Sequence, residues 1–101
     1  MKAGIVVINT ARGAVMDEAA LVKALDEGKV RSCGLDVYEE EPKVHEGLMR
    51  NRNVLLLPHA GTMTVETQKA MEVFTVANVR RAVVEGKLVG LVPEQSGMRW
   101  E

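Results

Sequence analysis

Three short apolar runs punctuate the first sixty residues of the chain. Residues 4–9 form a continuous, largely β-branched run, and residues 32–37 and 54–57 form two more. Runs of this length without polar alternation are typical of strands covered on both faces, as in a parallel sheet. The pattern therefore predicts about three buried parallel strands.

The segment between the first two runs has the period of an amphipathic helix. Asp17 is a suitable N-cap, apolar residues recur on one face as far as about Glu27, and Gly28 stands where a glycine commonly ends a helix. A strand, a helix and a strand in close succession form a βαβ unit, whose crossover should be right-handed.

The third strand is flanked by two segments of different character. Residues 38–53 are charged, contain Pro42 and Gly47, and are expected to form a long surface loop. Loops of this length are usually functional. Residues 64–85 predict a long helix with apolar residues on two sides, and Gly86 ends it. So wide an apolar surface indicates that this helix packs on two sides.

Together these elements predict an α/β fold. The expected architecture is a partial Rossmann-like parallel sheet of about three strands, with flanking helices and a long C-terminal helix. A polar segment follows each predicted strand, and ligands bind at the C-terminal ends of the strands in open parallel sheets. The residues able to do chemistry should therefore lie along one edge of the sheet.

Composition narrows the class of protein. The chain has 101 residues, 47% of them hydrophobic, and a net charge of −1 with both signs interspersed, which suits one small domain. There is no basic stripe or aromatic set for nucleic acid, no metal-ligand cluster, and no apolar run of the roughly 18 residues that a membrane span needs. Cys33 is the single cysteine, so a reducing, cytoplasmic compartment is expected.

Three residues at or near the strand ends are candidates for chemistry, each with a structural alternative. Arg12 could hold a carboxylate with two parallel hydrogen bonds, or it could simply cap a turn. Glu41, which precedes Pro42, could orient a neighbour, or it could be one of three solvated glutamates. His59 could transfer a proton at neutral pH, or it could be a hydrogen-bonded structural residue.

Three further positions carry polar or sulfur-containing side chains. Asp36 ends the second strand and could accept hydrogen bonds from an amide or cap the following turn. Cys33 is expected to be a small core residue, and His45 is expected to be solvated in the charged loop.

The order of four motifs carries a family resemblance. VVINTARG, DEAALVKAL, GLDVYEEEP and VLLLPHAGTMTVET follow one another as in the C-terminal half of the cofactor domain of D-isomer-specific 2-hydroxyacid dehydrogenases, from residue 1 to about residue 86. The spacing agrees, since Glu41 is 29 residues after Arg12 and His59 is 18 after Glu41. VPEQ and GTMTVET lean toward the glyoxylate/hydroxypyruvate-reductase-like branch.

The resemblance implies specific roles. Arg12 would bind the carboxylate and keto oxygen of a small 2-keto acid, His59 would be the general acid or base, and Glu41 would hold the imidazole and raise its pKa. Asp36 would contact the nicotinamide carboxamide of NAD or NADP. Full-length members of the family form homodimers. The positions implied to bind cofactor are Thr10, Ala11, Arg12, Asp36, His59 and Gly61.

The sequence also departs from the family. It contains no GxGxxG loop and no separate substrate domain, and Met1 matches an internal methionine of the family pattern. We therefore expect a fragment, with residues 1–86 from the second half of a dinucleotide-binding domain and residues 87–101 as a tail returning toward the substrate domain. Because the phosphate loop supplies much of the dinucleotide affinity, the hypothesis is that the chain alone is catalytically inactive.

Two alternatives remain open at this stage. The chain could be a non-catalytic interaction piece that pairs with a full-length paralogue through its doubly apolar helix. It could also be an unrelated α/β nucleotide-binding module, in which Arg12, Glu41 and His59 need not be close in space. The sequence decides neither the identity of the substrate nor the choice between NAD and NADP.

Overall fold

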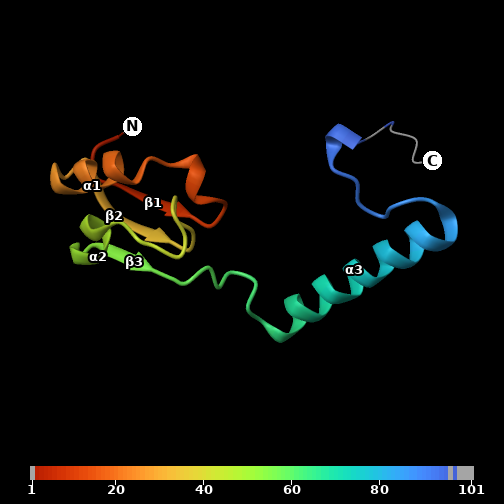
Figure 1. Ribbon diagram of the computed structural model, residues 1–101. Helices are drawn as coiled ribbons and strands as arrows, with labels where there is room; N and C mark the ends of the chain where they lie inside the picture. Colours follow the sequence, from red (N-terminus) through yellow and green to blue (C-terminus); the bar gives the residue numbers. More distant parts are fainter. Residues whose placement is uncertain (1, 96, 98–101) are drawn as a thin grey trace. The chain divides into compact units, whose positions relative to one another are not determined.

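The chain divides into two compact units, Met1–Gly61 and Thr62–Glu101. A computed structural model describes residues 2–95 and 97 (Figure 1). The first unit contains a sheet and two helices, and the second contains one long helix.

The sheet of the first unit has three parallel strands. They are β1 (Ile5–Asn9), β2 (Val30–Leu35) and β3 (Val54–Leu56), in the spatial order β1-β2-β3. All three predicted strands are present, which confirms the α/β class. The second strand begins and ends two residues earlier than predicted, and Asp36 lies just beyond it, where its backbone N–H still donates to the carbonyl of Asn9 at 3.0 Å.

The helix between the first two strands follows the prediction. α1 spans Glu18–Asp26, and the Asp17 side chain accepts a hydrogen bond from the Ala20 N–H at 2.8 Å, as an N-cap does. Gly28 has a φ of +70°, a left-handed conformation that glycine adopts without steric cost. A short 3₁₀ helix, η1 (Gly13–Val15), precedes α1.

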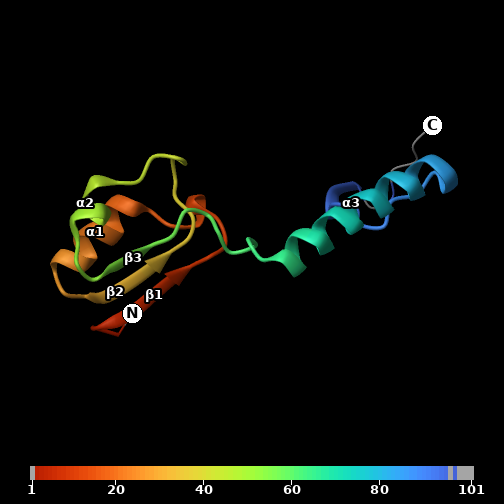
Figure 2. The same cartoon turned by 90° about the horizontal axis from the view of Figure 1, so that it is seen from below.

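Apolar side chains from both helices and the sheet form one core. α1 packs against β2 and against α2 (Glu46–Arg50), and α2 packs against β3 (Figure 2). The fully or nearly buried members of this core are Leu21, Leu25, Val30, Cys33, Leu35, Tyr38 and Leu48. Cys33 is thus the core residue that its apolar surroundings predicted.

The expectation that the strands are covered on both faces is wrong for the described chain. Ile5 and Val7 pack against the core, whereas Val6 and Ile8, which alternate with them, are exposed, Ile8 to 73%. In β3, Leu55 is exposed in the same way. Successive side chains of a strand point to opposite faces, so the helices cover one face of the sheet and leave the other face open.

The expectation of a long unstructured loop at residues 38–53 is also wrong. α2 lies within it, and its Leu48 is 0% exposed. His45 is exposed as expected, but its Nδ1 accepts a hydrogen bond from the Gly47 N–H at 3.1 Å and so caps α2. Gly47 has no side chain that would collide with Val22 of α1, which lets the two helices approach closely.

The second unit is dominated by α3 (Val65–Glu85). The Thr64 side chain caps it by accepting from the Thr67 N–H at 3.1 Å, and Gly86 ends it in the left-handed conformation, as predicted. No residue of α3 is buried, so the predicted packing on two sides is not present among the described residues. A short 3₁₀ helix, η2 (Pro93–Gln95), follows, and no helix of residues 2–95 is long and apolar enough to cross a membrane.

Candidate functional site

The polar residues of interest gather where the three parallel strands end. Asn9 ends β1, Asp36 follows β2, and His59 lies three residues beyond β3. The parallel register brings these ends together, because Asn9 lies beside Leu35 and Leu35 beside Leu56. One edge of the sheet therefore carries the candidate residues, as the sequence predicted.

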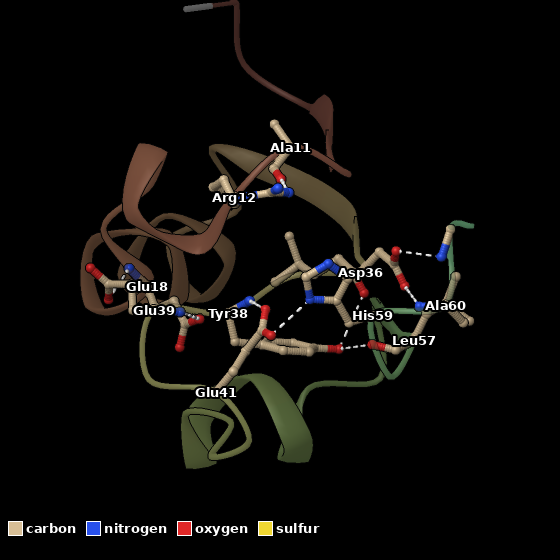
Figure 3. A network of polar contacts seen from close by, with 12 residues as sticks. Ala11, Arg12, Glu18, Asp36, Tyr38, Glu39, Glu41, Leu57, His59 and Ala60 are labelled. Atoms are coloured by element: carbon tan, nitrogen blue, oxygen red, sulfur yellow. Dashed lines mark hydrogen bonds and ion pairs between the residues drawn. The ribbon is translucent and has the colours of Figure 1, made fainter. Parts of the chain in front are cut away.

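Glu41 and His59 form the central pair of this edge. His59 Nδ1 lies 2.8 Å from Glu41 Oε2, and the other carboxylate oxygen of Glu41 accepts the Tyr38 N–H at 2.9 Å (Figure 3). The hydrogen bond from His59 is the main reason that the pKa of Glu41 is lowered, and the Tyr38 N–H lowers it further. Since Nδ1 faces Glu41, the imidazole Nε2 is left without a hydrogen bond within the described residues.

Arg12 lies near this pair without touching it. Its guanidinium Nη1 donates to the Ala11 carbonyl at 2.7 Å, and the residue is exposed. Its positive charge nevertheless contributes, as the last of several causes, to the lowered pKa of Glu41. The structure thus brings Glu41 and His59 into contact and leaves Arg12 within electrostatic range of the pair.

Each carboxylate oxygen of Asp36 accepts one hydrogen bond from the segment that carries His59. Its Oδ1 accepts the Ala60 N–H at 2.7 Å, and its Oδ2 accepts the Gly61 N–H at 2.8 Å. The side chain is buried. The amides that Asp36 binds in the structure therefore belong to the protein itself, and a contact with an amide of a ligand stays a prediction.

Two of the remaining candidate positions, Ala11 and Gly61, donate their N–H groups within the protein. Thr10 and Ala11 are exposed just beyond β1, and the Ala11 N–H donates to Asn9 Oδ1 at 3.1 Å. The Gly61 N–H is held by Asp36. A cofactor placed along this edge would therefore contact Ala11 and Gly61 through groups other than their N–H.

Besides Tyr38, sequence reasoning missed four residues that shape the site. Asn9 is buried, and its Nδ2 donates to the Arg12 carbonyl at 3.0 Å, which orders the turn that carries Arg12. Gly13 lies against the Tyr38 backbone so closely that a Cβ there would collide with the Tyr38 carbonyl. Asn9 could have been found from the sequence, because it is a polar residue at the end of an apolar strand. No sequence pattern indicates the close approach of Gly13 to the Tyr38 backbone.

The other two missed residues are glutamates that clasp each other's backbone. The Glu18 N–H donates to Glu39 Oε2 at 3.1 Å, and the Glu39 N–H donates to Glu18 Oε1 at 2.9 Å. This reciprocal pair ties the start of α1 to the segment that carries Glu41. Glu39 and Glu18 are 21 residues apart, so no local pattern predicts the clasp.

An open, mostly apolar pocket of about 610 Å³ adjoins the Glu41–His59 pair. No group of three or more histidine, cysteine, aspartate or glutamate side chains in the described part of the chain is arranged to hold a metal ion. The residues that line the pocket besides the pair itself are Tyr38, Pro42, Val44, Leu56, Leu57 and Pro58.

The fold and the site together define a class of protein. A parallel Rossmann-like sheet with a histidine–carboxylate pair at the carboxyl ends of its strands is an arrangement suited to an α/β domain that binds a ligand and transfers a proton. The comparison with known families agrees: residues 1–61 match the family described as D-isomer specific 2-hydroxyacid dehydrogenase, NAD binding domain. The chain belongs to this family, and its interpretation as an unrelated nucleotide-binding module is therefore wrong.

Individual relatives are similar over nearly the whole chain. It is 62% identical over 98 residues to 4-methyl-2-oxopentanoate reductase A of Aspergillus oryzae. The matched region covers 97% of this chain and 30% of that protein. The crystal structure of a glyoxylate reductase from Paecilomyes thermophila is 59% identical, with a TM-score of 0.91, over 94% of this chain and 29% of that one.

A third relative was solved with a dinucleotide. The glyoxylate/hydroxypyruvate reductase of Sinorhizobium meliloti, in complex with NADP and malonate, is 42% identical with a TM-score of 0.87 over 95% of this chain and 30% of that one. The chain thus spans under a third of the length of these relatives, in agreement with the expectation of a fragment.

Proposed function

We propose that the chain is the proton-transfer portion of an NAD(P)-dependent oxidoreductase that interconverts small 2-keto acids and D-2-hydroxy acids. The observation that carries this proposal is the 2.8 Å contact between His59 Nδ1 and Glu41 at the carboxyl edge of the sheet. Relatives named as reductases of glyoxylate, hydroxypyruvate and 4-methyl-2-oxopentanoate support the class of substrate.

In this proposal His59 moves the proton. During reduction its Nε2 donates a proton to the keto oxygen, and during oxidation the same atom takes the proton back. Glu41 accepts the Nδ1–H, so that it fixes the direction of the ring and stabilises the imidazolium. Arg12 would hold the substrate carboxylate in a two-pronged hydrogen bond. The nicotinamide, when bound, supplies the hydride to the substrate carbon.

The residues present fit the nicotinamide end of such a cofactor better than its phosphates. Thr10 and Ala11 are exposed at the edge beside His59, and buried Asp36 has acceptor capacity beyond its two backbone partners. No GxGxxG turn occurs in the sequence. We therefore propose that the isolated chain does not turn over substrate, because the pyrophosphate would need residues from the remaining two thirds of such an enzyme.

The decisive experiment restores the missing parts. These 101 residues would replace the matching segment of the Aspergillus oryzae reductase, and NADH or NADPH oxidation would be followed with 4-methyl-2-oxopentanoate and with glyoxylate. We expect an active chimera whose kcat falls about 10²–10⁴-fold on His59→Asn. Arg12→Lys should lower kcat/KM, because an ammonium cannot form the two-pronged bond.

The chain offers a matched control for the histidine variant. His45→Asn changes the other histidine, which is exposed and caps α2, and asparagine is also a good N-cap. This variant should keep full activity. A chimera that folds and binds cofactor but is equally active with His59→Asn would contradict the proposal, and cofactor oxidation by the isolated chain that His59→Ala abolishes would contradict its inactivity.

The arrangement of the longer protein is part of the same proposal. Residues 1–86 would form the second half of the dinucleotide-binding domain, which the family match supports as far as residue 61, and residues 87–101 would return toward a substrate domain. We also propose homodimers and a cytoplasmic location. The exposed apolar residues of α3 support the homodimer. The free thiol of Cys33 supports a reducing, cytoplasmic location.

A further inference from the structure

His59 has an unusual backbone conformation. Its φ is +53°, and it is the one non-glycine residue with a positive φ among the described residues. A side chain with a Cβ is disfavoured in this left-handed region, so the conformation persists only where surrounding contacts impose it. The residues that impose it therefore also decide where the imidazole points.

One short segment after β2 holds the chain on both sides of His59. On the C-terminal side, the Asp36 carboxylate accepts the Ala60 and Gly61 N–H groups. On the N-terminal side, the Tyr38 hydroxyl lies 2.6 Å from the Leu57 carbonyl oxygen (Figure 3). Asp36 and Tyr38 thus fix the backbone before and after His59.

Tyr38 also holds the partner of His59. Its backbone N–H donates to Glu41 Oε1 at 2.9 Å, while its hydroxyl holds Leu57, two residues before His59. One residue therefore connects the Glu41 segment to the His59 segment. Only 8% of Tyr38 is exposed, so the ring that carries the hydroxyl is itself held within the core.

The hydroxyl, rather than the ring, makes the connection to the His59 segment. A phenol has a single proton, and the Leu57 carbonyl at 2.6 Å is a nearer acceptor than the Leu35 carbonyl at 3.2 Å. A phenylalanine would fill the same volume in the core but could not donate. A role limited to packing would therefore survive loss of the hydroxyl, and a role in holding the His59 segment would not.

We infer that Tyr38 is a positioning residue, whose hydroxyl holds the backbone ahead of His59 so that the imidazole Nδ1 meets Glu41. The inference rests on the proposed function, because that proposal gives the Glu41–His59 pair its role in proton transfer. It concerns the geometry of the pair, however, and is measured without turnover.

The test is Tyr38→Phe in the complete 101-residue chain, studied by NMR. In the unsubstituted chain the His59 Nδ1–H should give a downfield proton signal, as expected for a hydrogen bond to a carboxylate. In Tyr38→Phe that signal should broaden or move upfield, and the Glu41 carboxyl should titrate at a higher pH. An unchanged Nδ1–H signal and an unchanged Glu41 titration would overturn the inference.

A matched variant separates positioning from general loss of packing. Cys33→Ala removes buried volume from β2, in the same core, but Cys33 has no hydrogen bond to Glu41 or His59. It should lower stability without moving either signal of the pair. Equal changes in the pair signals for Cys33→Ala and Tyr38→Phe would also contradict a specific role for the hydroxyl.

A second measurement covers the case in which Tyr38→Phe does not fold. Tyr38 is the single tyrosine of the chain, so 3,5-difluorotyrosine incorporated throughout labels this position alone. Its more acidic hydroxyl donates a stronger hydrogen bond, and the Nδ1–H signal should then shift in the direction opposite to that caused by the phenylalanine. No shift would contradict the inference.

The outcomes remain distinct from those of the chimera. If the chimera is inactive while Tyr38→Phe uncouples Glu41 from His59, the proposed function fails and the positioning role stands. If the chimera is active and Tyr38→Phe leaves the pair unchanged, the function stands and the positioning role fails.

Discussion

At the scale of the residue, hydrogen bonds to backbone groups do most of the positioning in this site. Asn9 orders the turn of Arg12, Asp36 holds the N–H groups after His59, and Tyr38 donates to both the Glu41 side chain and the Leu57 carbonyl. Each of these side chains is buried, where a polar group without a partner would be costly. Buried, hydrogen-bonded side chains therefore hold the segments that carry the candidate residues.

The titration of Glu41 is predicted at this scale. Because the His59 hydrogen bond lowers the pKa of Glu41 in the folded chain, the ionised carboxylate stabilises the fold above the pKa of an unfolded glutamate. This contribution is lost as the pH falls through the lower, folded value. NMR of the carboxyl carbon should show Glu41 titrating at a lower pH in the folded chain than in the urea-unfolded chain.

The variant His59→Asn provides the comparison. Loss of the imidazole should raise the pKa of Glu41 toward its ordinary value, while the Tyr38 N–H keeps part of the effect. Identical titration of Glu41 in the folded and unfolded chains would contradict the prediction.

At the scale of the element, the short helix α2 gives a regular, packed structure to part of the connection between β2 and β3. It lies between Glu41 and β3, and its Leu48 reaches the core shared with α1 and β2. The connection between Glu41 and β3 is therefore anchored to the core through α2.

Leu48→Ala should destabilise the first unit strongly. Removal of a fully buried leucine leaves a cavity, and such changes cost about 2–5 kcal/mol in the free energy of unfolding. Met49→Ala, one position further along and 59% exposed, should change it by less than about 0.5 kcal/mol. Urea unfolding followed by circular dichroism compares the two, and equal effects would show that α2 does not anchor the segment.

At the scale of the whole molecule, apolar surface is distributed unevenly. The first unit has a core but leaves one face of its sheet open, and α3 has no buried residue at all. Helices in proteins gain most of their stability from packing of an apolar face, so α3 lacks its main source of stability in the isolated chain. Exposed apolar surface of this extent is typical of a site of interaction with other polypeptide.

Hydrogen exchange should reveal this difference. In the isolated chain the backbone amides of α3 should exchange much faster than those of β2, which pairs with a strand on each side. In the chimera the amides of α3 should become protected. Protection of α3 equal to that of β2 in the isolated chain would contradict the prediction.

The sequence predicted the three strands and the two longer helices well, but it predicted the burial of the strands less well. Asp17, Gly28, Thr64 and Gly86 mark helix ends through local hydrogen bonds and backbone preference, so the helix boundaries agree with the structure within a residue or two. The burial of the strands was overestimated, because a continuous apolar run does not by itself show which elements cover each face of a strand. α2 was missed because five residues are too few to show a helical period.

What the sequence by itself determined is the order of the three strands and the two longer helices, the family, and the presence of Arg12, Glu41 and His59 at the family's spacing. These depend on local conformational preference and on motif order, both of which are written along the chain. The tertiary structure places Glu41 against His59, as the resemblance implied, and it alone decided that Asp36 holds the backbone after His59 and that Tyr38 connects the two segments. These contacts join residues up to 25 positions apart, and their geometry depends on packing and on the parallel register of the sheet.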